Sequence, residues 1–332
     1  MIRQFTAALA CAALVTVACG QSAEPEPSEA PAPPEEESAP VNPMNEYGMT
    51  ASNVFLYYAD VEAATTFYTR TLGFAVAADY GFAKILRVGP SSFITLVDEE
   101  MGMHSASDPK TVAIALITDQ LDEWWDYMKD QDVEMRFPYN PVEGRPHHGF
   151  VAIDPEGYLL EFERFNEHAE NEMLIPVLNE TETIYPAEGA SNVPPGLGFK
   201  ATVVWFYYKD MPAIQAFYEE VMGFDLIVDQ GWTKIYRISP SGYMGLVDET
   251  RGMHNFTETK AVTMSFWTDR IDDWYAYVSS HGSFEMRSEK VEETDRYRAF
   301  VAYDPEGYYL EWNVFKDAPD NETLHRMLRG EE

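Results

Sequence analysis

Segments in which apolar residues have the spacing of a strand alternate with segments in which they have the spacing of a helix. The same order of segments occurs several times along the chain. Residues 53–59 (NVFLYYA) are rich in aromatic and β-branched side chains and predict a strand. Asp60 then caps a helix that ends at Gly73, and two or three short strands follow up to Val97. The pattern therefore predicts a unit of one strand, one helix and about three further strands.

The same unit starts again at residue 111. Residues 111–118 predict a strand, Asp119 caps the next helix, and strands over 150–153 and 158–162 close the unit. The apolar positions of this helix follow the period of a buried helical face, so core packing explains them better than a cofactor site does. They are Leu121, Trp124, Trp125 and Met128.

The chain from about residue 50 onward is a duplication. Asp60 corresponds to Asp210, and the DPEG segment at 154–157 corresponds to the one at 304–307, with an offset of 150 residues in both cases. A period of this length indicates a duplicated domain, because the units of a solenoid have only about 20–50 residues. We therefore expect two tandem modules joined by a polar linker that contains prolines.

The first residues have the pattern of a bacterial lipoprotein signal. An apolar stretch over 5–18 follows Arg3 and is shorter than the roughly 20 residues that span a bilayer. It ends in TVACG, which resembles a lipobox with Cys19 as the lipidated residue, and an ordinary secretory signal is the alternative. The other cysteine, Cys11, lies in the segment that would be removed, so the mature chain would have no disulfide. We expect a lipid-anchored protein of the cell envelope, on the outer membrane facing the periplasm.

The charge of the chain limits the classes of partner that it can bind. The formal net charge is −33, which would repel nucleic acids and anionic membranes. We therefore expect a small-molecule ligand, membrane attachment through the N-terminal lipid only, and no nucleic acid. The acidic, proline-rich segment after Cys19 is typical of an extended tether. The expected domains are a signal peptide (1–18), the tether (19–49), a first module (50–165), a linker (166–197), a second module (198–315) and a charged tail (316–332).

The repeated unit resembles the vicinal oxygen chelate superfamily, which contains glyoxalases, bleomycin resistance proteins and dioxygenases. The motifs that carry the resemblance are FY at 67–68 and 217–218, LGF at 72–74 and MGF at 222–224, and the two DPEG segments that lead to Glu161 and Glu311. The resemblance implies an α+β fold of two tandem glyoxalase-like modules. Each module would consist of paired βαβββ units that form a cup-shaped mixed sheet.

Enzymes of this superfamily hold a divalent metal in the cup, and the resemblance allows its ligand positions to be assigned. The last-strand ligand falls on Glu161 and Glu311, and the first-strand ligand on Asn53 and Val203. The other positions hold Val112, Val262, Leu96 and Leu246. Because valine and leucine offer no donor atom, we expect no catalytic metal and no other cofactor, with a divalent metal as the alternative.

Two pairs of residues are candidates for acid–base chemistry. Glu161 and Glu311 would lie in partly apolar cups that raise a carboxyl pKa, although pairing with an arginine or the sheet is the structural alternative. His104 and His254 follow equivalent LVDE segments and would act as catalytic groups or fix local hydrogen bonds. The expected ligand-binding residues are Asn53, Phe55, Tyr57, Trp205, Tyr207 and Tyr309.

His147 and His148 resemble a pair of metal ligands, but adjacent residues of a strand point to opposite faces, so both are interpreted as surface residues. The losses at ligand positions favour a metal-independent module that binds a small aromatic or amphiphilic compound. A glyoxalase-group metalloenzyme with lyase, isomerase or dioxygenase activity is the alternative, and a structural envelope protein with filled cups is a third.

Overall fold

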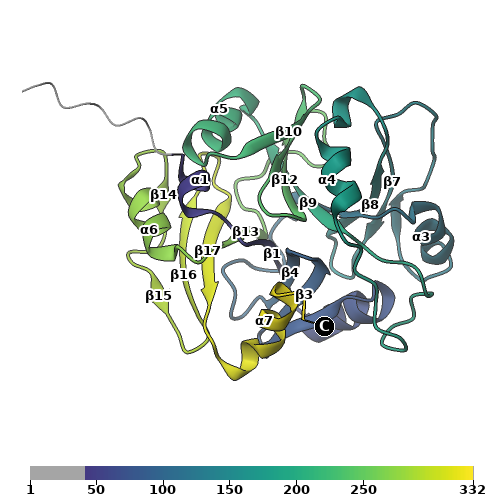
Figure 1. Ribbon diagram of the computed structural model, residues 1–332, viewed down its shortest axis with the longest axis horizontal. Helices are drawn as coiled ribbons and strands as arrows, with labels where there is room; N and C mark the ends of the chain where they lie inside the picture. Colours follow the sequence, from purple (N-terminus) through teal and green to yellow (C-terminus); the bar gives the residue numbers. More distant parts are fainter. Residues whose placement is uncertain (1–41, 332) are drawn as a thin grey trace, which may run out of the picture. The chain divides into compact units, whose positions relative to one another are not determined.

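The computed structural model describes residues 42–331, whose strands form two mixed sheets (Figure 1). Cys19 and the expected signal lie outside these residues. The first sheet has the order β14-β16-β17-β13-β1-β4-β3-β2, with β15 beside β16, and the second has the order β10-β11-β12-β9-β5-β8-β7-β6. No helix among residues 42–331 is long and apolar enough to cross a membrane.

The strands of the first sheet are β1 (Ala51–Tyr58), β2 (Ala75–Asp79), β3 (Ala83–Gly89), β4 (Ser92–Asp98), β13 (Val262–Trp267), β14 (Glu285–Met286), β15 (Glu292–Glu293), β16 (Tyr297–Tyr303) and β17 (Tyr309–Phe315). Those of the second sheet are β5 (Val112–Ile117), β6 (Met135–Phe137), β7 (His147–Ile153), β8 (Leu159–Phe165), β9 (Ala201–Tyr208), β10 (Asp225–Asp229), β11 (Thr233–Arg237) and β12 (Gly242–Asp248). Parallel and antiparallel pairs occur in both, as expected for an α+β fold with mixed sheets.

Each sheet combines one βαβββ unit from the first half of the chain with one from the second half. β1 pairs antiparallel with β13, with Asn53 opposite Ser265, and β5 pairs antiparallel with β9. Figure 1 shows the yellow strand β17 near the purple and blue strands of the N-terminal half. This differs from the expectation that each module closes its own cup. The four units share the same order of elements, so the repeat alone does not specify which two units pair.

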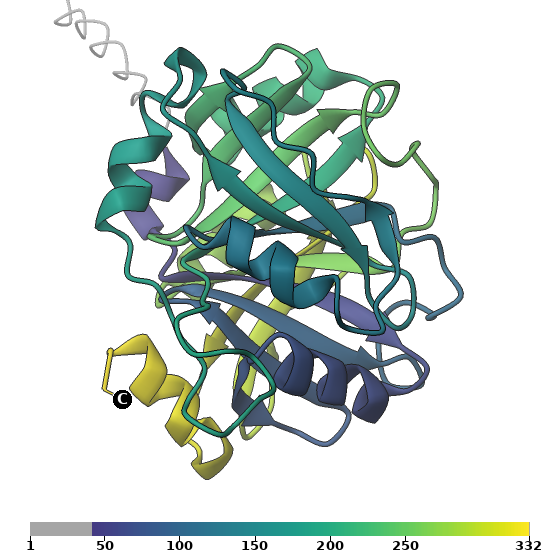
Figure 2. The ribbon, with the colours of Figure 1, turned by 90° about the vertical axis from the view of Figure 1, so that its right-hand side faces the viewer.

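The helices of the βαβββ units follow the expected positions, but one expected cap is wrong. Asp119 does not cap its helix, because the helix begins one residue later after Gln120 and the Asp119 carboxylate pairs with Lys200 at 2.6 Å. Asp60 caps α2 (Val61–Thr66) by accepting a hydrogen bond from the backbone N–H of Ala63, and Asp210 caps α5 (Met211–Ala216) in the same way. Both helices continue into a short π-helical segment, η1 (Phe67–Thr71) and η3 (Phe217–Val221). α3 (Leu121–Met128) and α6 (Ile271–Ser280) bury Trp124 and Trp274 in a core shared with one face of each sheet. Figure 2 shows α3, in teal, in front of the strands.

Three further short helices occupy segments that the sequence analysis assigned to the tether, the linker and the tail. α1 (Pro43–Tyr47) packs Tyr47 on Trp274 at 5.6 Å between ring centroids. α4 (Leu174–Glu180) follows the 3₁₀ turn η2 (Ala169–Asn171), and α7 (Glu322–Leu328) follows η4 (Pro319–Asn321). Leu174 and Leu324, 150 residues apart, are both buried, so the repeat extends beyond the two expected modules.

The repeated DPEG segment forms the loop between the last two strands of each half. Hydrogen bonds connect this loop to the first strand of the same half. The carboxylate of Asp304 accepts hydrogen bonds from the hydroxyls of Tyr208 (2.7 Å) and Tyr218 (3.0 Å) and from the backbone N–H groups of Glu306 and Tyr308. Asp154 makes the equivalent set in the first half. Since β9 and β16 belong to different sheets, this cluster holds the two sheets together.

Candidate functional site

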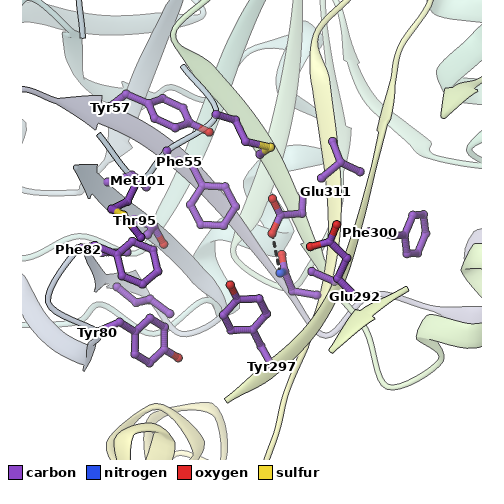
Figure 3. Close-up of a pocket in the computed structure, with 18 of the residues that line it drawn as sticks. Phe55, Tyr57, Tyr80, Phe82, Thr95, Met101, Glu292, Tyr297, Phe300 and Glu311 are labelled. Carbon is purple, nitrogen blue, oxygen red and sulfur yellow. Dashed lines mark hydrogen bonds between the residues drawn. The ribbon is translucent and has the colours of Figure 1, made fainter. Parts of the chain in front are cut away.

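The first sheet curves around a cavity of about 540 Å³, and strands from both of its ends line the cavity. β1, β3 and β4 form one wall, and β16 and β17 form the opposite wall, so we call this space the open cup. Figure 3 shows Phe55 and Tyr297 directed into it from opposite sides, whereas Phe300 points away. The volume is in the usual range of small-molecule sites. The aromatic residues of the walls are Phe55, Tyr57, Tyr80, Phe82, Tyr297 and Phe315.

Glu311 is the buried acidic residue of the open cup. Its side chain extends from β17 and accepts a hydrogen bond from the amide of Asn313 at 2.7 Å (dashed in Figure 3). No donor within residues 42–331 bonds the other carboxylate oxygen. Burial raises the pKa of Glu311 to about 7, because the Asn313 amide offsets only part of the desolvation and Glu292 adds repulsion. The group is therefore close to half ionised at neutral pH.

The corresponding space on the second sheet is filled by side chains, and we call it the filled cup. Trp205 of the filled cup is 8% exposed, and its indole ring lies over Gly245. A Cβ added at Gly245 would be 2.0 Å from that ring. In the open cup, Phe55 and Thr95 occupy the equivalent paired positions. The missing side chain at Gly245 thus leaves room for the tryptophan. Further residues of this buried cluster include Leu174, Leu178, Tyr207, Tyr243 and Val247.

The sequence of each half matches the model of one protein family. The Glyoxalase/Bleomycin resistance protein/Dioxygenase superfamily matches residues 50–162 and again residues 201–312. The chain belongs to this superfamily. A comparison with curated proteins found no match.

Solved structures of the superfamily share the fold over most of the tandem chain. A putative dioxygenase from Bacillus subtilis subsp. subtilis str. 168 is similar with a TM-score of 0.58 at 16% identity, over 84% of this chain and 90% of that one. Glyoxalase I from Zea mays is similar with a TM-score of 0.55 at 14% identity, over 86% of this chain and 96% of that one. At such low identity these similarities concern the fold and not the reaction.

The open cup does not offer the donor set of the superfamily's metal site. Glu311 and Glu292 are its two carboxylates, and the part of the chain that the structure describes brings no third His, Cys, Asp or Glu ligand atom close to them. The other oxygens that face the cavity belong to neutral side chains, several of which bond one another. Thr95 donates to Asn53 at 3.0 Å, and the hydroxyls of Tyr57 and Thr263 are 2.7 Å apart. The amide nitrogen of Asn53 is buried without a hydrogen-bond partner. A divalent cation requires several charged or strongly donating ligands, so these residues do not fit one.

Four positions that the resemblance assigned to metal ligands point away from the cups. Leu96, Leu246, Val112 and Val262 are buried in the core shared with the helices. Strand alternation places their neighbours Thr95 and Thr263 on the cup face instead. The assignment was therefore one residue out of register in these strands, although the residues on the cup face do not complete a metal site either.

The histidine candidates are structural neighbours of the cups and do not line the cavity. His104 packs against Tyr57 and Tyr309, with ring centroids 4.9 and 4.2 Å apart, and His254 packs against Tyr207. Burial lowers the pKa of both histidines to about 4, so both are neutral at physiological pH.

The expected ligand-binding residues divide between the two cups. Phe55 and Tyr57 line the cavity, and Asn53 bonds Thr95, which also lines it. Trp205 and Tyr207 fill the other cup, where Glu161 lies on β8. The guanidinium of Arg287 lies over the ring of Tyr309, with its central carbon 5.1 Å from the ring centroid.

His147 is the residue that sequence reasoning missed. Adjacent histidines do point in opposite directions, since the His148 ring bonds the carbonyl of Val142 at 2.8 Å. The His147 ring, however, contacts the carboxylate of Glu163 beside Glu161, at the filled cup. Reading Glu163 together with Glu161 as neighbours on one face of the same strand would have supplied the signal.

Proposed function

We propose that the open cup binds a small organic molecule that carries an aromatic group and a cationic or hydrogen-bond-donating group, and that it does so without a catalytic metal. The observation that carries this proposal is the buried carboxylate of Glu311, which faces an aromatic cavity with one oxygen lacking a donor. Aromatic walls favour a planar ligand, and a buried carboxylate favours a donor or a cation. The strongly negative chain adds a field that attracts cations.

A matched pair of probes tests the polar part of this site. Tryptamine carries an ammonium group, whereas tryptophol carries a hydroxyl group on the same indole scaffold. Glu311→Gln is expected to weaken tryptamine binding by about tenfold or more, because it removes the charge from a buried hydrogen-bonded pair. Tryptophol should lose much less. Isothermal titration calorimetry measures both, with Glu161→Gln in the filled cup as the control variant that keeps wild-type affinity.

The pH dependence follows from the pKa of Glu311, which burial raises to about 7. Tryptamine stays protonated well above this value, as an alkylamine such as the lysine side chain does. Its affinity should therefore rise with pH through about 7 and level off above, and should fall towards tenfold per pH unit below about 6. A flat profile, or an unchanged profile in Glu311→Gln, would contradict this role of the carboxylate.

We also propose that a lipid on Cys19 anchors the protein to the cell envelope, with the acidic segment after it as a tether. The support is the TVACG sequence together with the single cysteine that would be left after cleavage. Cys19→Ala is expected to move the protein from the membrane fraction to the soluble fraction, since stable anchoring needs the acyl chains. Wild-type protein recovered in the soluble periplasmic fraction would argue against the anchor.

A further inference from the structure

Three equivalent positions on the last two strands of each cup carry polar side chains, and two of the three differ between the cups. The filled cup has His147, Glu161 and Glu163, where the open cup has a tyrosine, a glutamate and an asparagine, each 150 residues further on. Pairing of β7 with β8 places Gly149 opposite Glu163 and Val151 opposite Glu161, so all three side chains share one face of the sheet. The open cup therefore keeps one carboxylate bonded to an amide, whereas the filled cup gathers two carboxylates and an imidazole.

These three side chains converge closely. One ligand atom from each of His147, Glu161 and Glu163 lies within 4.8 Å of the others, and Nδ1 of His147 contacts one oxygen of Glu163. The Glu163 side chain is 1% exposed, and its second oxygen is buried without a hydrogen-bond partner. The backbone of β7 lies close to the group at Gly149, where an added Cβ would be 2.9 Å from the carbonyl oxygen of Phe162 and 3.7 Å from a carboxylate oxygen of Glu161.

Two carboxyl groups and one imidazole share this space, and the imidazole of His147 contacts the carboxylate of Glu163. Burial and the neighbouring carboxylate raise the pKa of Glu161 to about 8, although His147 partly offsets them. The pKa of His147 rises to about 9, because the attraction of Glu163 outweighs the desolvation of the ring. Two carboxylates with a neutral imidazole carry a charge of 2−, which balances that of a divalent cation.

We propose that His147, Glu161 and Glu163 form a binding site for a divalent transition-metal cation of the zinc type. One imidazole nitrogen and two carboxylate oxygens are a donor set that such cations accept at tetrahedral or larger coordination numbers. The His147 side chain is 41% exposed, so water reaches the remaining coordination positions from that side. This site is separate from the open cup and leaves Glu311 free for an organic ligand.

Calorimetric titration of tag-free, EDTA-treated and dialysed protein with zinc chloride at about pH 7.5 tests the site. We expect one zinc ion per chain, and an affinity at least tenfold lower in His147→Ala and in Glu163→Gln. The matched controls are His148→Ala, which removes the neighbouring imidazole, and Glu311→Gln, which alters the equivalent glutamate. Both should bind zinc like the wild type. Every variant has the same N-terminal segment, so any zinc bound by that segment cancels in the comparison.

Circular dichroism and thermal melting check that each variant folds. If Glu163→Gln does not fold, His147→Tyr replaces it, because Tyr297 occupies the equivalent position in the open cup and shows that the fold accommodates that side chain. Retention of wild-type zinc affinity by the folded His147 variants would overturn the proposal. A wild-type protein that binds no zinc, or an equal loss in His148→Ala, would overturn it as well.

Discussion

Replacing Asp304 with alanine is expected to lower the free energy of unfolding by about 3–5 kcal/mol. The carboxylate accepts four hydrogen bonds, from the hydroxyls of Tyr208 and Tyr218 and from two backbone N–H groups, and is 4% exposed. Alanine would leave the two backbone N–H groups and one of the two hydroxyls without this acceptor, because the hydroxyls, which are 3.1 Å apart, can donate to each other only once. The same change would loosen the connection between β9 and the turn before β17, and therefore between the two sheets. Urea unfolding followed by circular dichroism measures the loss.

Two variants make this prediction specific. Asp304→Asn keeps one oxygen for the backbone N–H groups and should cost clearly less than alanine. Asp320→Ala removes a carboxylate that is 42% exposed and pairs with Arg296, so its effect should stay below about 1 kcal/mol. Similar losses for Asp304→Ala and Asp320→Ala would show that the buried cluster does not hold the sheets together.

The double substitution Phe55→Trp with Thr95→Gly is expected to close the open cup and lower tryptamine affinity about a hundredfold or more. It transfers the pair that fills the other cup, where the Trp205 indole lies over Gly245. The equivalent pairing of Phe55 with Thr95 gives the introduced indole the same register. Tryptamine binding measured by calorimetry reports the loss, while thermal melting confirms that the variant is folded.

The reciprocal double variant is the control. Trp205→Phe with Gly245→Thr changes the filled cup and leaves every residue of the cavity in place. Its tryptamine affinity should equal that of the wild type. If the reciprocal variant loses binding and Phe55→Trp with Thr95→Gly keeps it, tryptamine binds at the filled cup and our account is wrong.

The architecture could be predicted from the sequence because its signals are local and repeated. The caps Asp60 and Asp210 and the buried tryptophan Trp124 have the expected positions, since capping and amphipathic spacing depend on nearby residues. The exchange of units between the halves could not be predicted. It depends on which of several similar strands pair, such as β1 with β13, and this choice is made by packing over long sequence distances.

The candidate site was predicted less completely, and strand register explains why. Glu311 was placed correctly on the cup face, because it follows a turn motif at a fixed distance. Leu96 and Val262 were assigned to the wrong face, since a shift of one residue turns a strand position over. Which cup stays open could not be read either. Gly245 has no side chain and so leaves room for Trp205 of the neighbouring strand, which fills that cup. The residue pattern of one strand alone does not predict such a contact between two strands.

The central claim, that the open cup binds an aromatic cation through Glu311, is tested most directly by a crystal structure of the protein with tryptamine. The concentration is chosen to saturate the binding measured in solution. Our account predicts ordered compound between Phe55 and Tyr297, with its ammonium nitrogen at hydrogen-bonding distance, about 2.7–3.0 Å, from the Glu311 carboxylate. Ordered tryptamine in the filled cup, or an open cup without the compound at saturation, would contradict it.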